Sequence, residues 1–283
     1  MSQKSYILLF ELLLVTVISA QTKHAVVIGI GKYQDSAWNV IHGDKDVPVV
    51  KQMLVNSGFS DITTLTNSEA TKAGISSTFQ SLLNRCRKND IVYIHFSGHG
   101  QRMTDVNGDE DDGWDESWIP YDACFSYCNR DRGEKHLSDD EVGAWMTEIR
   151  KKIGIKGQIV LVVDACHSGD SSRNLDDLCV RGVEKNFILP HSDKRKVGKI
   201  KEDWLTVSAC KNYQQNCEII TKNGNYGMLT YALYQLRNGL RDEDNSTLMK
   251  HLEIFVDNHR GSLPQTPVLT GNINRYAVRD VFK

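Results

Sequence analysis

Residues 158–169 read QIVLVVDACHSG, and the apolar part of this stretch indicates the class of fold. Its five consecutive apolar residues, Ile159 to Val163, favour a strand that is buried on both faces of a parallel sheet. In such sheets the functional residues follow the carboxyl ends of the strands. Cys166 lies just past that end, before a Ser-Gly turn that can open a helix and favour a thiolate. Most isolated cysteines are structural, so Cys166 alone does not predict catalysis.

A second stretch supplies a partner for this thiol. Residues 90–100 read DIVYIHFSGHG, again a β-branched and aromatic run that ends in a turn. Glycines on both sides of His99 allow a sharp turn and leave the imidazole unobstructed. Two buried strands ending in Cys166 and His99 would bring a thiol next to a base, which is the recurring arrangement for nucleophilic acyl transfer.

These motifs closely resemble those of the metacaspases, the caspase-like cysteine peptidases of bacteria, protists, fungi and plants. The likeness rests on SGHG at 97–100, DEDDGWDE at 109–116 and DACHSG at 164–169, and it extends from about His24 to the end. In caspases the catalytic cysteine follows Gln-Ala, and the histidine is about 50 residues upstream. Here Asp164 replaces that glutamine and the histidine is further upstream, which favours a metacaspase.

The resemblance implies a caspase-like three-layer sandwich, with a mostly parallel six-strand sheet flanked by helices. Strands alternating with helices along the chain also favour a single α/β domain, which we expect to span residues 21–283. The resemblance further implies endopeptidase activity, with His99 as the base for Cys166. The backbone N–H groups of Gly100 and Cys166 would then form the oxyanion hole.

The same resemblance predicts the substrate pocket. Its expected residues are Ser97, Asp164 and the acid before the helix at 47–54. Asp46 matches that last position best, and Asp44 is the alternative. Negative charge at Asp46 and Asp164 favours arginine or lysine before the cleaved bond and rejects aspartate. The expected partners are therefore peptides and proteins with exposed basic residues.

The acidic stretch 105–116 contains seven carboxylates in twelve residues, which repel one another unless a cation neutralises them. An EF-hand is excluded because Glu110 stands where that loop requires glycine. By resemblance, Asp115, Asp139 and Asp140 would bind an activating Ca²⁺ ion.

Residues 1–20 combine a lysine, an apolar stretch and a small-residue end, which predicts a cleaved signal peptide. We therefore expect export to a periplasmic or extracellular location, without a stable membrane anchor, as a monomer. The net charge of −2 and the unclustered basic residues give no support to a nucleic-acid partner.

The polar stretch 170–203 predicts a mobile loop that the enzyme cuts, with the cut expected between Lys194 and Lys201. In the alternative, its lysines only keep a surface loop soluble. Cys124 with Cys128, and Cys210 with Cys217, are candidate disulfides in an exported chain.

Two other functions compete with this prediction. A cysteine phosphatase requires Cys-x5-Arg, and Arg173 comes one position too late after Cys166. A catalytically silent, calcium-dependent binding module with the same fold remains the alternative, although intact His99 and Cys166 favour the enzyme.

Overall fold

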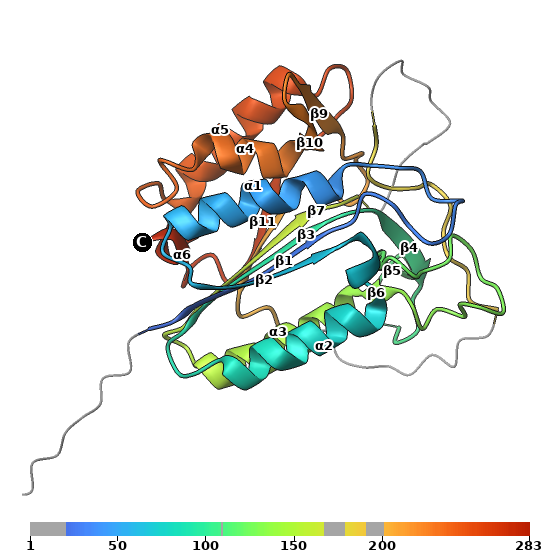
Figure 1. Cartoon of the computed structure of the whole chain (residues 1–283), viewed down its shortest axis with the longest axis horizontal. Helices are drawn as coiled ribbons and strands as arrows, with labels where there is room; N and C mark the ends of the chain where they lie inside the picture. Colours follow the sequence, from blue (N-terminus) through green and yellow to red (C-terminus); the bar gives the residue numbers. More distant parts are fainter. Residues whose placement is uncertain (1–20, 109, 167–178, 191–200) are drawn as a thin grey trace, which may run out of the picture.

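The computed structural model describes residues 21–108, 110–166, 179–190 and 201–283 (Figure 1). Six strands form the central sheet in the order β11-β8-β7-β3-β1-β2. Their bounds are β1 Lys23–Gly29, β2 Asp61–Thr66, β3 Ile91–Ser97, β7 Gln158–Asp164, β8 Leu205–Ser208 and β11 Val268–Gly271. All neighbours pair in parallel except the edge strand β11, which is antiparallel to β8. The expected six-strand, mostly parallel sheet is confirmed.

Helices cover both faces of this sheet (Figure 1). One layer contains α1 Gly43–Asn56, α4 Met228–Leu236, α5 Asn245–His259 and the short α6 Arg279–Phe282, and the other contains α2 Lys72–Arg85 and α3 Asp139–Ile153. Successive residues of β1 alternate between the layers: Ala25 and Val27 pack with α1, whereas Val26 and Ile28 pack with α2. Because both faces are covered, the strands are apolar throughout instead of alternating.

Two smaller sheets lie outside the pattern expected from the sequence. The first consists of β4 Gly100–Thr104, β5 Trp114–Trp118 and β6 Leu137–Ser138, and the second is the hairpin of β9 Glu218–Thr221 and β10 Gly224–Gly227. A 3-10 turn, Asn67–Glu69, follows β2. Tyr226 pairs with Ile219 across this hairpin, so α4 begins only at Met228.

All seven cysteines are free thiols, so neither expected disulfide is present. The Cys128 thiol donates a hydrogen bond to the Cys124 sulfur at 3.4 Å, and the Cys210 thiol donates to the carbonyl of Gln214. Within the described ranges, every helix is too short or too polar to cross a bilayer.

Candidate active site

The register of β3 and β7 brings the two motifs together. Ser97 pairs with Asp164 at the ends of these adjacent parallel strands. His99 and Cys166 each follow the paired end by two residues, so they leave the sheet at the same edge. Both side chains are buried. Strand pairing therefore places both residues at one edge of the sheet.

The His99 ring has a defined tautomer. Its Nε2 lies 2.9 Å from the backbone carbonyl oxygen of Asn39, and a carbonyl can only accept, so Nε2 carries the proton and donates it. The Nδ1 atom is buried and has no hydrogen-bond partner among the described residues. Burial lowers the pKa of His99 to about 4, although the Asn39 carbonyl opposes that shift. The ring is therefore neutral near pH 7, with a free lone pair on Nδ1 that suits a base.

Hydrogen bonds from its thiol and its backbone N–H help to fix Cys166. Its thiol donates to the carbonyl oxygen of Gln214 at 2.7 Å, and its backbone N–H donates to the carbonyl oxygen of Arg181 at 2.8 Å. The backbone N–H of the expected nucleophile thus already binds a peptide carbonyl. Gly100, the other expected donor, begins β4 and pairs there with Trp118.

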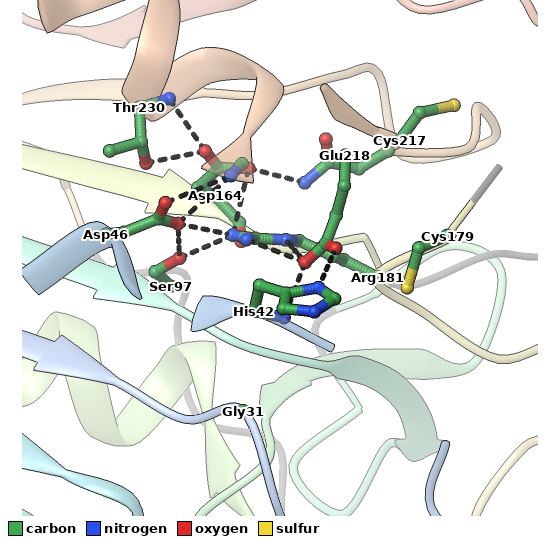
Figure 2. Close-up of polar contacts among 12 residues, drawn as sticks. Gly31, His42, Asp46, Ser97, Asp164, Cys179, Arg181, Cys217, Glu218 and Thr230 are labelled. Carbon is green, nitrogen blue, oxygen red and sulfur yellow. Dashed lines mark hydrogen bonds and ion pairs between the residues drawn. The ribbon is translucent and has the colours of Figure 1, made fainter. Parts of the chain in front are cut away.

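Four buried side chains, Asp46, Ser97, Asp164 and Glu218, surround a single site that we call the acidic pocket (Figure 2). Asp46 comes from the first turn of α1, Ser97 and Asp164 from the ends of β3 and β7, and Glu218 from the start of β9. The three residues expected from the sequence are therefore brought together. Asp44, the alternative to Asp46, contacts Asn67 and Lys45 instead.

The side chain of Arg181 fills this pocket and is completely buried. Its Nη1 lies 2.8 Å from Asp46 and 3.7 Å from Asp164, while its Nε and Nη2 donate to Oε1 of Glu218 at 3.0 and 2.9 Å (Figure 2). Burial alone would lower the pKa of Arg181, but the three carboxylates raise it overall. Burial raises the pKa of Asp46 to about 6, against the opposing effect of Arg181.

A second set of polar groups holds the carboxylates in place. Thr230 donates to Asp164 from its backbone N–H and its hydroxyl at 2.7 and 2.6 Å, and the Asn216 amide donates to Asp164 at 2.7 Å. The backbone N–H of Gly227 donates to Asp46 at 3.0 Å. A β-carbon at Gly227 would collide with both Asp164 and Arg181, so only glycine fits against the guanidinium.

Sequence reasoning missed Glu218 and Arg181. No motif marks Glu218, which reaches the pocket through the hairpin and is held by the ring and the backbone N–H of His42 at 2.6 and 2.7 Å. A signal for Arg181 was present, because it is a basic residue within the stretch 170–203 that was expected to be cut. The cut was expected between Lys194 and Lys201, and residues 194–200 lie outside the described residues.

The expected calcium ligands lie near one another around β5 and α3. Asp115 is buried in β5, and Asp139 and Asp140 open α3. Burial, together with the neighbouring negative charges of Glu116, Asp115 and Asp140, raises the pKa of Asp139 to about 8. Oxygen ligands whose charges repel one another suit a divalent cation such as Ca²⁺, so the residues present fit this ion.

A second group of metal-binding side chains lies beside the acidic pocket. Within the described part of the chain, the ligand atoms of His42, Cys179 and Glu218 all lie within 4.8 Å of one another. Both oxygens of Glu218 already accept hydrogen bonds, from His42 or from Arg181. The hydrogen bonds of the acidic pocket therefore explain why these three side chains lie close together.

Comparison with known proteins places these features in context. The chain matches the family model described as the caspase domain over residues 22–277. Metacaspase-2 of Arabidopsis thaliana is 35% identical over 229 residues, which cover 75% of this chain and 51% of that protein. Metacaspase-1 of Coccidioides immitis is 29% identical over 157 residues, covering 53% and 32%. Metacaspase-1B of Aspergillus oryzae is 37% identical over 99 residues, covering 35% and 21%. The chain thus spans between about a fifth and a half of the length of these relatives.

Two crystal structures share the fold. A protein of Geobacter sulfurreducens superimposes with a TM-score of 0.62 at 22% identity, covering 88% of this chain and 92% of that one. Caspase-1 of Spodoptera frugiperda superimposes with a TM-score of 0.59 at 15% identity, covering 89% of both chains. At such identities these likenesses concern the fold alone.

Proposed function

Since this chain belongs to the caspase-domain family of cysteine peptidases, whose metacaspases are its curated relatives, we propose that it is an endopeptidase that cuts after arginine or lysine. His99 and Cys166 carry the chemistry in this proposal. The neutral imidazole of His99, with its free Nδ1, supports the role of base. The backbone N–H of Cys166 supports the role of oxyanion donor, because it already binds a carbonyl.

The reaction proceeds through an acyl-enzyme. His99 takes the thiol proton, and the sulfur of Cys166 attacks the carbonyl carbon of the scissile bond. The N–H groups of Cys166 and Gly100 stabilise the charge that develops on the carbonyl oxygen. His99 then protonates the leaving amine, and water hydrolyses the thioester to release the new carboxylate and restore the thiol.

One observation carries the preference for basic residues: three buried carboxylates converge on one guanidinium. A neutral or acidic side chain would leave Asp46 and Asp164 buried without this counter-charge, and Glu218 with its contact to His42, which is strongly unfavourable. Two Arg181 nitrogens donate to Glu218 together, and the planar guanidinium suits this contact better than the point charge of lysine. We therefore expect arginine to be preferred over lysine.

Calcium stimulation, export and self-processing are parts of the same proposal. The carboxylates of Asp115, Asp139 and Asp140 would hold Ca²⁺, which neutralises their mutual repulsion when bound. Export depends on residues 1–20, which lie outside the described residues.

Fluorogenic peptides that differ only in Arg, Lys, Asp or Leu before the cleaved bond test this proposal. The calcium-incubated chain should cleave the Arg peptide fastest, the Lys peptide next and the other two at background. The Cys166→Ala chain is the control and should be inactive while keeping the circular dichroism of the parent. Equal cleavage of all four peptides, or activity that survives Cys166→Ala and thiol alkylation, would overturn the proposal.

A further inference from the structure

Arg181 reaches the acidic pocket with its backbone as well as its side chain. Its carbonyl oxygen accepts from the backbone N–H of Cys166 at 2.8 Å, and its own N–H donates to the carbonyl of Asn216 at 2.9 Å. Two residues earlier, the carbonyl of Cys179 accepts from the N–H of Glu218 at 2.8 Å. Val180, between them, forms an antiparallel bridge with Cys217. Residues 179–181 thus lie as an added strand along residues 216–218, the way an extended peptide binds a sheet edge.

The bond that follows Arg181 lies against the expected nucleophile. A β-carbon at Gly182 would fall 3.1 Å from the β-carbon of Cys166 and closer still to its carbonyl group, so only glycine fits there. The carbonyl carbon between Arg181 and Gly182 is therefore next to Cys166, with its oxygen on the Cys166 N–H. These are the contacts that a substrate cleaved after arginine requires.

Packing and hydrogen bonds also hold the chain after Gly182 in place. Val183 is buried in a cluster with Trp38, Ile119 and Ala123. Phe187 is buried and hydrogen-bonds along β4, donating its N–H to Arg102 at 2.7 Å and accepting from Thr104 at 3.0 Å. The segment is thus held on both sides of the 181–182 bond and leaves no room for another peptide.

We propose that this chain holds its own Arg181–Gly182 bond in the active site as an internal substrate, which blocks other substrates until that bond is cut. This inference rests on the proposed function, since it uses the same nucleophile and pocket. It names a single bond, whereas the sequence predicted a cut between Lys194 and Lys201. The carbonyl of Arg181 contacts Cys166, and its side chain fills the acidic pocket (Figure 2). A basic residue that was only exposed at the surface would make neither contact.

Cleavage of the Arg181–Gly182 bond requires one movement, that of the Cys166 thiol. The proton transfers then take place between groups of this chain. The Cys166 thiol leaves the carbonyl of Gln214, gives its proton to Nδ1 of His99, and its sulfur bonds to the carbonyl carbon of Arg181. The bond to the Gly182 nitrogen breaks, and His99 returns the proton to that nitrogen, which becomes a new amino terminus. Water then hydrolyses the thioester, leaving Arg181 with a carboxylate and Cys166 with its thiol.

The test uses the full chain and four variants, with calcium added at time zero. Intact mass and amino-terminal sequencing locate the first cut, while an Arg peptide reports turnover in the same samples. The wild type should acquire a new terminus at Gly182, at a rate independent of protein concentration, and peptide turnover should begin after a matching lag. Cys166→Ala should stay uncut, also when active enzyme is added, because its Arg181 bond is sheltered in its own site.

Variants at the bond sharpen the result. Lys185→Gln is the matched control, a basic residue four positions on, and should be cut as the wild type is. Arg181→Lys keeps the charge and should be cut at the same bond, more slowly. Arg181→Gln should lose this cut and hydrolyse the Arg peptide without a lag. If Arg181→Gln does not fold, the wild type, Lys185→Gln and Arg181→Lys still decide the matter.

The outcomes separate this inference from the proposed function. A first cut elsewhere with the 181–182 bond intact, or full peptide turnover by the uncut wild type, would overturn the inference alone. No cut together with no hydrolysis of any basic peptide would instead overturn the proposed function.

Discussion

Among the described residues, Asp46 forms the shortest ion pair with Arg181, at 2.8 Å, and its side chain is completely buried. Removing one partner of a buried, hydrogen-bonded charge pair costs about 2–5 kcal/mol. We therefore expect Asp46→Asn to lower kcat/KM for Arg peptides by a factor of roughly 30 or more. Asp44→Asn is the matched control, two positions away but part-exposed and paired with Lys45, and should change little. Equal losses in both variants, measured by steady-state kinetics, would contradict this assignment.

Two buried histidines make stability depend on pH. Burial lowers the pKa of both His95 and His99 to about 4, well below the ordinary 6.5. The unfolded chain therefore binds more protons between these values, so stability is present above pH 6.5 and is lost as pH falls towards 4. By pH 4, protonation of each ring in the unfolded chain lowers the free energy of unfolding by roughly 3 kcal/mol, at about 1.4 kcal/mol per pKa unit.

Urea unfolding of Cys166→Ala between pH 4 and 7 measures this dependence without self-cleavage. Adding His99→Gln should flatten the slope, because one of the two rings no longer titrates. Asp46 acts in the opposite direction, since burial raises its pKa to about 6, but it is common to both proteins. A slope that His99→Gln leaves unchanged would place the titrating groups elsewhere.

Site residues at or just after the end of a strand could be predicted from sequence. Site residues that distant loops contribute could not. Ser97, Asp164, His99 and Cys166 follow apolar runs, so the sheet geometry alone brings them together. Arg181 lies 135 positions from Asp46 along the chain, and no local pattern links the two. Such pairings depend on the path of loops, which sequence periodicity does not encode.

Among the strands, the long buried ones could be predicted from the sequence, whereas the short, partly exposed β5 could not. β3 is buried along its whole length and β7 at every residue after Gln158, so both strands could be predicted from their apolar runs. β5 reads WDESW and overlaps the acidic stretch 105–116, so the sequence predicts no strand there, although β5 pairs with both β4 and β6. Short, half-polar strands are stabilised by their neighbours more than by intrinsic preference.

The contact between β5 and α3 is where calcium should act. Asp115 is buried and adds to the charge that raises the pKa of Asp139 to about 8. Activity should rise with calcium at roughly 10⁻⁴–10⁻³ M, the range of extracellular modules. Asp115→Ala should blunt this response and reduce calcium binding in calorimetry. Asp111→Ala removes an exposed charge from the same acidic run and should do neither. Full activity of the wild type in chelator would contradict the site.

On the scale of the whole molecule, a cut after Arg181 divides the sheet between two pieces. The first piece keeps β1, β2, β3 and β7 with the helices α1 to α3, and the second keeps β8, β11 and the helices α4 to α6. β7 and β8 are parallel neighbours across this division, with Val160 opposite Leu205. Val160 and Leu205 share one apolar cluster with α1 and α4. The acidic pocket is divided too, since Glu218 belongs to the second piece.

The two pieces should therefore stay together after the cut. Separating them would expose the apolar cluster, at about 25 cal/mol for each Å² of apolar surface returned to water, whereas the cut itself removes one covalent link. Cut wild type should elute from a sizing column with uncut Cys166→Ala, melt in one cooperative transition and resolve into two bands only on a denaturing gel. Elution of separate fragments without denaturant would show that the shared sheet does not hold them. Retained Arg-peptide hydrolysis by the single eluting species would show that Glu218 still faces Asp46 and Asp164 across the cut.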